Sequence, residues 1–436
     1  MTLTGSRTYV GFGFGAIQAG LFLYEADRSG AFGRLVVADV VPELVSAVRR
    51  AGGCYALNIA HADRVERTEV GPVEILDVAV AADRERLVEA LAAAEEIGTA
   101  VPGVGHYVSE GPGSLHRLLA EGLRRKAARG GPRAVVYTGE NHNHAAEILE
   151  SHTLGELKAT DREAVRQRVR FLNTVIGKMS GVVSDPDEIR SQGLAPVTPG
   201  ENRAFLVEAF NRILISEVRF EGPPGQAGFE RAITVFEEKP DLLPFEEAKL
   251  YGHNATHALA AYVGALLGAR HIADLTGVPG AMGFLRAAFI EESGAALIGK
   301  HRGVDPLFTD EGYRRYADDL LQRMTNPFLR DTIGRVGRHP ERKLGWQDRL
   351  IGTIRMATGQ DVEPRRYAFG AAAALAHLDG SLTEDVARAR RALETLWGDN
   401  APPGAERQSV LDCVDEGIGR LRAWRDAGRP PLDKFV

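Results

Sequence analysis

The sequence predicts an α/β domain with a parallel sheet in residues 1–200, followed by a mainly α-helical domain in residues 201–436. Three observations lead to this fold class. A glycine-rich turn lies between a short apolar strand and a helix near the N-terminus. Strand-like and helix-like segments then alternate, which is typical of a parallel sheet covered on both faces. From Pro244 onward the apolar residues recur almost everywhere with the helical period.

The elements of the first domain follow in order. Short apolar or β-branched runs predict strands, and longer amphipathic segments between them predict helices. Pro42 suits the first turn of the helix that it opens. The segment 162–179 also looks helical, and 205–219 and 229–237 look mixed. The expected strands are 7–12, 35–38, 74–79 and 134–137, and the expected helices are 16–27, 42–50, 84–96 and 114–129.

The second domain is expected to be helical throughout, with a boundary in the Pro/Gly-containing stretch 190–205. The tail that begins at Gly428 is expected to be a loosely held end. Helical runs are predicted near 244–268, 280–300, 310–324, 326–336, 345–357 and 382–397.

Composition excludes several classes of function. The 436 residues are 44% hydrophobic and 26% charged, as in ordinary globular proteins. A net charge of -6 gives no footprint for nucleic acid or an anionic membrane. With only two cysteines and no visible signal peptide, a cytoplasmic protein is expected, either monomeric or a small homo-oligomer.

The turn after the first strand predicts a dinucleotide site of the Rossmann type. Two registers fit: Gly11, Gly13 and Ala16, or Gly13 and Gly15 with Gln18 in third place. Glycines let the backbone approach a pyrophosphate at a helix N-terminus. Asp39 would bind a ribose diol and repel a 2′-phosphate, which favours NAD over NADP. A turn that merely packs helix on strand is the alternative. The expected cofactor residues are Gly11, Gly13, Phe14, Gly15, Ala16, Ile17, Gln18, Asp39, Val40, Thr99, Ala100 and Val101.

The run from Lys249 to His257 predicts the chemical site. At about 100° per residue, Lys249, Asn254, His257 and Glu246 share a helical arc of roughly 140°. A lysine with a lowered pKa can take the proton of an alcohol, and an amide can steady the developing alkoxide. A surface Glu–Lys pair beside a core histidine is the plainer alternative. His253 lies on the same arc, and a substrate role for it stays open.

The pattern Lys249-x4-Asn254-x2-His257 resembles that of the polyol-specific long-chain dehydrogenase family. The resemblance covers residues 7–375 and is tightest over 245–350. It implies a metal-independent NAD enzyme in which Lys249 is the general acid/base and His257 holds the substrate. It also implies that Asn173 shares an oxyanion-binding role with Asn254, and that Glu246 matches a gating carboxylate. Gly177-Lys178 departs from the family's usual Asp-Arg.

A basic run suggests the branch of this family that acts on phosphorylated polyols. Arg338, Arg342 and Lys343 flank a turn and suit a dianionic phosphate, although a solvated basic face would look the same. The expected reaction interconverts a polyol phosphate and a ketose phosphate, with mannitol 1-phosphate and fructose 6-phosphate as the first pair to test. An unphosphorylated polyol, a hexuronate, and a non-catalytic dinucleotide-binding sensor remain alternatives. The histidines at 142, 144 and 152 lack the ligand spacing of a zinc site.

Overall fold

The computed structural model describes residues 5–221 and 228–436, and the chain divides into two units, Met1–Leu242 and Leu243–Val436. The boundary therefore lies well beyond the expected stretch 190–205. The physical reason is strand pairing, because the strands that follow residue 200 are hydrogen-bonded to strands of the first unit. These strands are β10 (Ala204–Glu208), β11 (Ile213–Ser216) and β12 (Phe236–Lys239).

The larger sheet of the first unit has eight strands in the order β12-β11-β8-β7-β6-β1-β2-β5. Every neighbouring pair from β8 to β5 is parallel, and only β11 runs antiparallel to its neighbour β8. The predicted parallel sheet is thus confirmed. Its first six strands are β1 (Arg7–Phe12), β2 (Phe32–Asp39), β5 (Glu74–Asp77), β6 (Glu96–Thr99), β7 (Ala134–Thr138) and β8 (Val169–Val175).

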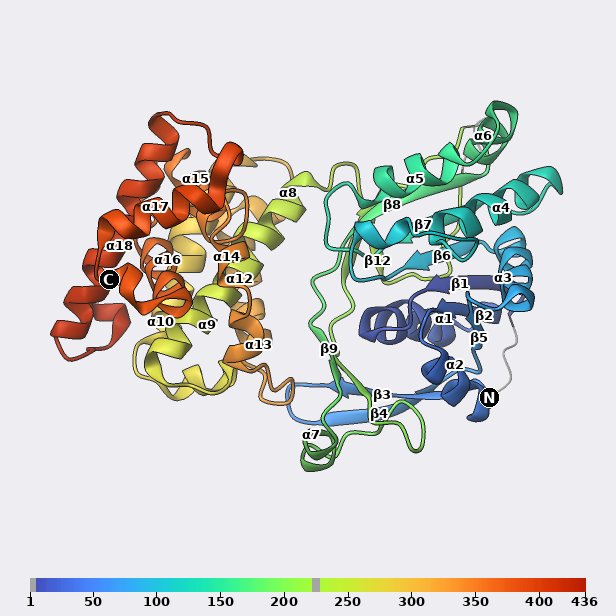
Figure 1. Ribbon diagram of the computed structural model, residues 1–436, viewed down its shortest axis with the longest axis horizontal. Coiled ribbons are helices and arrows are strands. Elements are labelled where there is room, and N and C mark those ends of the chain that lie inside the picture. The colour runs from blue at the N-terminus through green and yellow to red at the C-terminus, as the bar shows by residue number, and fades with distance from the viewer. Residues whose placement is uncertain (1–4, 222–227) are drawn as a thin grey trace. The chain divides into compact units, whose positions relative to one another are not determined.

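Helices cover both faces of this sheet (Figure 1). Successive residues of β1 point to opposite faces, so Tyr9 packs in one hydrophobic core and Val10 in the other. The Tyr9 side is covered by the helix that follows the glycine turn, namely π turn η1 (Gln18–Leu23) and α1 (Tyr24–Ser29), and by α2 (Pro42–Arg50). The other side is covered by α3 (Ala81–Ala93), α4 (Leu115–Ala128), α5 (Ala145–Gly155) and α6 (Ala159–Arg166).

A smaller sheet in the same unit has the order β4-β3-β10-β9. The sequence interpretation did not include its strands β3 (Tyr55–Ala60), β4 (Val65–Val70) and β9 (Ser180–Val183). β4 is largely solvent-exposed and its sequence is charged, so it carries little apolar signal. The helix after β9 is α7 (Pro186–Ser191), capped by the Asp185 carboxylate.

The helix expected over 162–179 is only partly present. α6 ends at Arg166, and residues 169–175 instead form β8, which pairs with β7 on one side and β11 on the other. Short apolar runs of this kind fit a buried strand and a buried helix equally well. Here the pairing partners on both sides decide in favour of the strand.

The second unit is built from helices in its described residues, with α16 (Arg365–Leu378) buried from Tyr367 to Leu375. The long runs expected at 244–268 and 280–300 are present, each interrupted by a π turn, η3 (Ala248–Asn254) and η5 (Ala288–Gly294). The run expected at 326–336 is reduced to the short helix α13 (Ile333–Gly337). The remaining helices are α8 (Leu243–Glu247), α9 (Ala255–Leu267), α10 (Ala281–Ala287), α11 (Ala295–Lys300), α12 (Asp310–Met324), α13 (Ile333–Gly337), α14 (Pro340–Lys343), α15 (Ile351–Thr358), α17 (Val386–Trp397) and α18 (Ala405–Asp426).

The C-terminal tail is packed, contrary to the loose end expected from its sequence. Leu432 is 2% exposed and begins a short 3-10 turn, η9 (Leu432–Lys434). The indole N–H of Trp424 donates a hydrogen bond to the carbonyl of Pro430. A buried apolar anchor and a satisfied indole together hold the tail against the unit.

Candidate active site

The glycine turn of the first unit has the geometry of a nucleotide-binding loop. Gly13 has φ +80°, and its N–H donates to the carbonyl of Ala38 at the end of β2. A Cβ on Gly13 would lie 2.7 Å from the carbonyl oxygen of Ala100, so only glycine fits there. A Cβ on Gly15 would meet nothing within 4 Å, which leaves room for a ligand. Gly13 therefore makes the tight turn and Gly15 borders open space, which agrees with the second register.

Gln18 occupies the third position of that register, but its side chain does not face the open side of the turn. It is fully buried, and its amide Nε2 donates to the Tyr9 hydroxyl at 2.8 Å. A Cβ on Gly11 would lie 2.2 Å from the same Nε2. Gly11 and Gln18 thus pack the helix that follows the turn against strand β1. The structure shows this packing role for both residues, and their cofactor contact stays a prediction.

Asp39 shapes the turn at the end of β2. One carboxylate oxygen accepts the Phe14 N–H at 2.6 Å, and the other accepts the Val41 N–H at 2.9 Å. A carboxylate has about four acceptor sites, so hydrogen-bonding capacity remains for a ribose diol. The open space at Gly15, the helix that starts at Ala16 and this carboxylate fit a dinucleotide. Val40 is 73% exposed beside it.

A buried carboxylate that the sequence interpretation missed holds the loop after β6. Glu140 accepts hydrogen bonds from the Thr99 hydroxyl at 2.8 Å, from the Val101 N–H at 2.9 Å and from the Tyr107 hydroxyl. Burial raises the pKa of Glu140 above its ordinary value, although the hydrogen bonds from these three donors act to lower it. Glu140 follows β7, the strand that pairs in parallel with β6, so both carboxyl ends lie at one edge. That adjacency was the available signal.

Asn173 lies near the end of β8 and not at a helix start. Its side-chain oxygen accepts the Ala146 N–H at 2.9 Å, and its Nδ2 donates to both Glu147 carboxylate oxygens, at 2.9 and 3.1 Å. These bonds fix the first turn of α5. The structure shows this capping contact, and the oxyanion role stays a prediction. Lys178 from the atypical Gly177-Lys178 pair donates to backbone carbonyls of the same unit, including that of Phe210 at 2.9 Å.

In the second unit, Lys249 and Asn254 both belong to the π turn η3, and His257 follows in α9. The predicted arc assumed 3.6 residues per turn, which does not hold here. A π turn is closed by i→i+5 hydrogen bonds, so residues five positions apart, such as Lys249 and Asn254, are neighbours along the helix. π turns occur frequently at functional sites. The interruption therefore brings the amine and the amide onto one face.

The Lys249 ammonium is destabilised by its surroundings. Burial and the positive charge of Arg349 lower its pKa to about 8, while Glu246 opposes the shift. The neighbouring carboxylate, Glu247, accepts from Lys300 and His301, each at 2.7 Å. Glu246 is thus the carboxylate whose charge acts on Lys249, and its gating role stays a prediction.

The two histidines of this segment differ in surroundings. His257 Nε2 lies 3.3 Å from a carboxylate oxygen of the buried Asp331. His253 is buried, and burial together with the nearby cations lowers its pKa well below the ordinary value. Its ring is therefore neutral at physiological pH. The centroids of the two rings are 6.2 Å apart.

The basic residues expected to bind phosphate differ in their exposure to solvent. Lys343 is 5% exposed, and burial and the charge of Arg349 lower its pKa to about 8. Its amine donates to the carbonyl of Arg338. Arg349 is 13% exposed and bonds Asp348 at 2.7 Å. The side chains of Arg338 and Arg342 are exposed instead. Arg349, which influences both Lys249 and Lys343, joins the two parts of the expected site.

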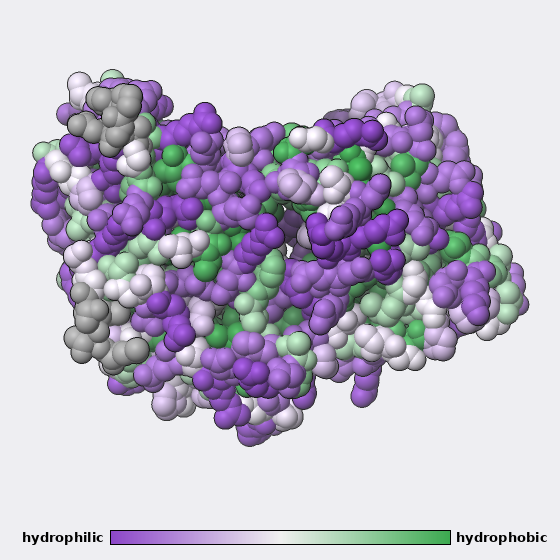
Figure 2. All heavy atoms as spheres, turned by 180° about the vertical axis from the view of Figure 1, so that it is seen from behind, coloured by the Kyte–Doolittle hydropathy of each residue, from purple (hydrophilic) through white to green (hydrophobic). Residues whose placement is uncertain are grey.

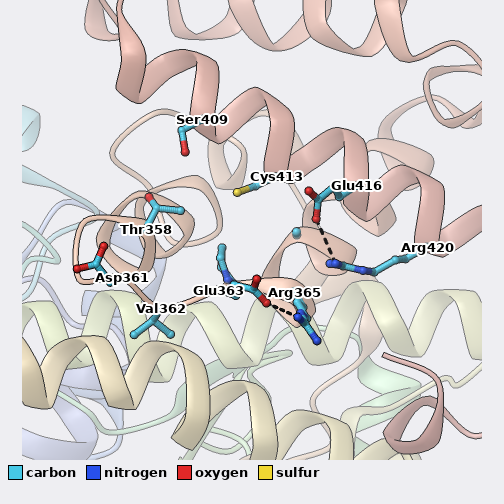
Figure 3. Close-up of a pocket in the computed structure, with 11 residues that line it drawn as sticks. Thr358, Asp361, Val362, Glu363, Arg365, Ser409, Cys413, Glu416 and Arg420 are labelled. Atoms are coloured by element: carbon cyan, nitrogen blue, oxygen red, sulfur yellow. Dashed lines mark hydrogen bonds and ion pairs between the residues drawn. The ribbon is translucent and has the colours of Figure 1, made fainter.

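The pocket shown in Figure 3 is lined by none of the expected site residues. It has a volume of about 360 Å³ and lies between the turn before α16 and helix α18.

The described residues contain no group of three or more histidine, cysteine, aspartate or glutamate side chains able to hold a metal. Within the same residues, no helix is both long and apolar enough to cross a membrane. Figure 2 shows mainly hydrophilic residues on the visible face, with small scattered hydrophobic areas.

Two sequence comparisons decide the family. The pattern described as mannitol dehydrogenase C-terminal domain matches residues 241–390, which include Lys249, Asn254 and His257. The mannitol-1-phosphate 5-dehydrogenase of Bacillus licheniformis is 30% identical over 366 residues, 84% of this chain and 86% of that protein. The chain belongs to the mannitol dehydrogenase family. The resemblance inferred from the lysine-to-histidine pattern is thereby confirmed, and the chain is a polyol oxidoreductase.

Solved structures agree with the mannitol dehydrogenase fold. The Pseudomonas fluorescens mannitol 2-dehydrogenase, solved as a ternary complex with NAD and D-mannitol, has a TM-score of 0.69 at 17% identity, covering 100% of this chain and 95% of that one. A D-sorbitol dehydrogenase in substrate-free form has a TM-score of 0.72 at 17% identity, covering 99% and 95%. At these identities the likeness concerns the fold, and it confirms the predicted fold class.

Proposed function

We propose that this mannitol dehydrogenase family member is an NAD-dependent enzyme that interconverts a polyol phosphate and a ketose phosphate, with mannitol 1-phosphate and fructose 6-phosphate as the first pair to test. The observation that carries the proposal is the shielded amine of Lys249, whose pKa is lowered to about 8 beside Asn254 on a π turn. The printed name of the relative from Bacillus licheniformis supports the phosphorylated substrate. The NAD in the mannitol 2-dehydrogenase complex supports the cofactor.

The chain's own residues supply the proton chemistry. In the oxidation, the neutral Lys249 amine accepts the proton of the substrate hydroxyl, and in the reduction its ammonium returns that proton to the carbonyl oxygen. The Asn254 amide donates a hydrogen bond to the same oxygen as negative charge develops on it. NAD, held by the glycine turn and Asp39, would supply the hydride acceptor. His257 holds a neighbouring substrate hydroxyl, in line with the role implied by the resemblance.

The first unit provides the cofactor residues. The backbone around Gly15 and the helix that begins at Ala16 bind the pyrophosphate, because N–H groups of a first helical turn have no partner within the helix. Asp39 accepts hydrogen bonds from the ribose diol and repels a 2′-phosphate. Glu140 keeps Thr99 and Val101 in place at the end of β6. Each of these groups acts by orientation, which is most of what a protein contributes to hydride transfer.

Lys343 and Arg349 are the cations best suited to the substrate phosphate. Both are largely buried, and a desolvated cation attracts a dianion more strongly than an exposed one. Arg349 also lowers the pKa values of Lys249 and Lys343. A bound phosphate would therefore relieve the repulsion among three neighbouring cations. The exposed Arg338 and Arg342 have no such constraint and contribute less in this proposal.

The test is a comparison of substrates with the full-length protein. NADH oxidation is followed with fructose 6-phosphate, fructose and a keto-uronate, and again with NADPH in place of NADH. The proposal expects the highest kcat/KM for fructose 6-phosphate with NADH. A higher kcat/KM for fructose or for the uronate would replace the phosphorylated substrate by an unphosphorylated one while keeping the reaction. No turnover with any ketose would favour the non-catalytic sensor.

A variant locates the phosphate contact. Lys343→Met should raise KM for fructose 6-phosphate by about tenfold or more, because a charged hydrogen bond contributes roughly 1.5–3 kcal/mol. The same substitution should change KM for unphosphorylated fructose only slightly. Arg286→Met is a matched control, since Arg286 is a surface cation of the same unit that pairs with Asp318 at 2.6 Å. An unchanged KM for fructose 6-phosphate in Lys343→Met would remove Lys343 from the phosphate site.

A further inference from the structure

A carboxylate lies directly beside the histidine that is expected to hold the substrate. Asp331 is 5% exposed, and its Oδ2 atom is 3.3 Å from Nε2 of His257. Its Oδ1 atom pairs with the guanidinium of Arg335. Both partners belong to the second unit. The Asp331–His257 pair is thus a local feature of helix α9 and the segment before α13.

The backbone holds Asp331 in place from both directions along the chain. The preceding residue, Arg330, has φ +48°, a left-handed conformation that is costly for a bulky side chain. The Asp331 carbonyl accepts the Ile272 N–H at 2.9 Å, and the Ile333 N–H donates to the Arg270 carbonyl at 2.9 Å. These two bonds tie the segment to residues 270–272 before it enters α13. A carboxylate fixed in this way has little freedom to turn from the imidazole.

Arg335 alone does not account for the burial of Asp331. The Arg335 side chain is 45% exposed and pairs with Asp331 at i,i+4. A carboxylate on the protein surface can form such an i,i+4 ion pair equally well, so the pair does not require Asp331 to be buried. The oxygen that faces His257, Oδ2, is buried, and its 3.3 Å approach to Nε2 is an ion-pair contact without hydrogen-bond geometry. Burying a carboxylate is costly unless a charged or hydrogen-bonding partner meets it. The imidazole is the partner on that side.

We infer that Asp331 is a positioning residue that sets the orientation and tautomer of His257, an inference that rests on the proposed function for its substrate contact. A carboxylate beside Nε2 requires the proton on that nitrogen, so the neutral ring carries its lone pair on Nδ1. Nδ1 then accepts a hydrogen bond from a substrate hydroxyl. Asp331 acts on the substrate through His257 and does not touch the reacting atoms.

A double-mutant cycle tests this coupling. Asp331→Asn keeps the size of the side chain but removes the charge that selects the Nε2–H tautomer, so kcat/KM should fall roughly tenfold to a hundredfold, as for other residues that orient a functional histidine. His257→Asn should cost a similar factor. In the His257→Asn background, Asp331→Asn should change kcat/KM less than about twofold, because the residue it acts through is gone. Asp318→Asn is the control for loss of a paired carboxylate elsewhere in the unit.

A spectroscopic measurement separates this inference from the proposed function. In the full chain with ¹⁵N-labelled histidine, the ring signals of His257, assigned from His257→Asn, should show the proton on Nε2 in the wild type and a mixture of tautomers in Asp331→Asn. Equal effects of Asp331→Asn in both backgrounds, or an unchanged tautomer, would overturn the positioning role. If the wild type oxidises no polyol, the proposed function fails, and the tautomer alone decides the inference.

Discussion

At the scale of single residues, the proposed reaction depends on a lysine that can lose its proton near neutral pH. With a pKa of about 8, roughly a tenth of Lys249 is neutral at pH 7, whereas an ordinary lysine is neutral in fewer than roughly one molecule in a thousand. Burial and Arg349 cause this difference. The sequence predicted Lys249 as the base, but it contained no measure of the surroundings of this side chain. The positive charge that lowers its pKa belongs to Arg349, which lies a hundred positions away in the sequence.

The lowered pKa predicts opposite pH dependences for the two directions. Polyol oxidation needs the neutral amine, so its kcat/KM should rise with pH to a plateau, with a midpoint near 8. Ketose reduction needs the ammonium, so its kcat/KM should be full below that midpoint and fall above it. Initial rates between pH 6 and 10 measure both profiles.

Arg349→Met is the matched variant for this prediction. Removing the neighbouring positive charge stabilises the ammonium, so the oxidation midpoint should move to higher pH. Arg286→Met, which removes a distant surface cation, should leave the midpoint where it is. Identical midpoints in all three proteins would show that another group titrates.

Asp39 predicts the cofactor preference. Because it accepts both the Phe14 N–H and, in the proposed complex, a ribose hydroxyl, Asp39→Ala should weaken NADH binding by about tenfold to a hundredfold. The affinity for NADPH should fall much less in this variant, since the repulsion between Asp39 and the 2′-phosphate disappears at the same time. Asp39→Asn retains an oxygen acceptor for the Phe14 N–H but lacks the charge. It should therefore reduce the preference for NADH over NADPH, with a smaller loss of NADH affinity than in Asp39→Ala. Fluorescence titration measures both cofactors, and an unchanged NADH affinity in Asp39→Ala would contradict the assignment.

Several individual residues have contacts that the sequence could not reveal. Gln18 fits the cofactor pattern, yet its amide is used inside the core by Tyr9. Asn173 fits an oxyanion role, yet it caps α5 in this structure. Glu140 and Asp331 lie in no familiar motif and become visible only through the groups they bond. A residue's type was predictable in these cases, but its partner depends on the tertiary fold.

At the scale of elements, local patterns were informative where one face or one turn decides the structure. The strand at 7–12 and the helix at 42–50 agree with β1 and α2 at both ends. β8 was misread because a seven-residue apolar strand has no distinctive period. The π turn η3 was also not predicted, since one extra residue per turn leaves no compositional trace. It changes which side chains share a face with Lys249.

The glycine turn gives a matched pair of predictions. Gly13→Ala should destabilise the chain by about 1–3 kcal/mol, because alanine is strained at φ +80° and its Cβ would press on the Ala100 carbonyl. Gly15→Ala should leave the unfolding temperature nearly unchanged, since its Cβ has open space. NADH affinity should nevertheless fall in Gly15→Ala, because that space is where the pyrophosphate is proposed to bind. Thermal unfolding without and with NADH measures both effects.

Two results would contradict the account of this turn. A Gly15→Ala variant that binds NADH as tightly as the wild type would show that the cofactor does not approach this glycine. A Gly13→Ala variant of unchanged stability would show that the turn relaxes around a Cβ. The first result would move the nucleotide site away from the position proposed here, and the second would remove the structural requirement for glycine at position 13.

At the scale of the whole molecule, the order of an α/β unit and a helical unit was predictable, whereas the boundary was not. Strands β10, β11 and β12 lie after residue 200 but belong to the first unit by pairing. Such long-range pairing has no local signature. The family was predictable because Lys249, Asn254 and His257 keep a specific spacing. The cytoplasmic location and the oligomeric state stay predictions.

The most direct test of the central claim is the turnover of Lys249→Ala in the full-length protein. The account predicts that this variant binds NADH with unchanged affinity, while kcat for polyol oxidation falls by about a hundredfold or more, the usual contribution of a general base. Added primary amines should restore part of the activity. A variant that oxidises the polyol at a rate close to that of the wild type would contradict the role of Lys249 as the proton acceptor.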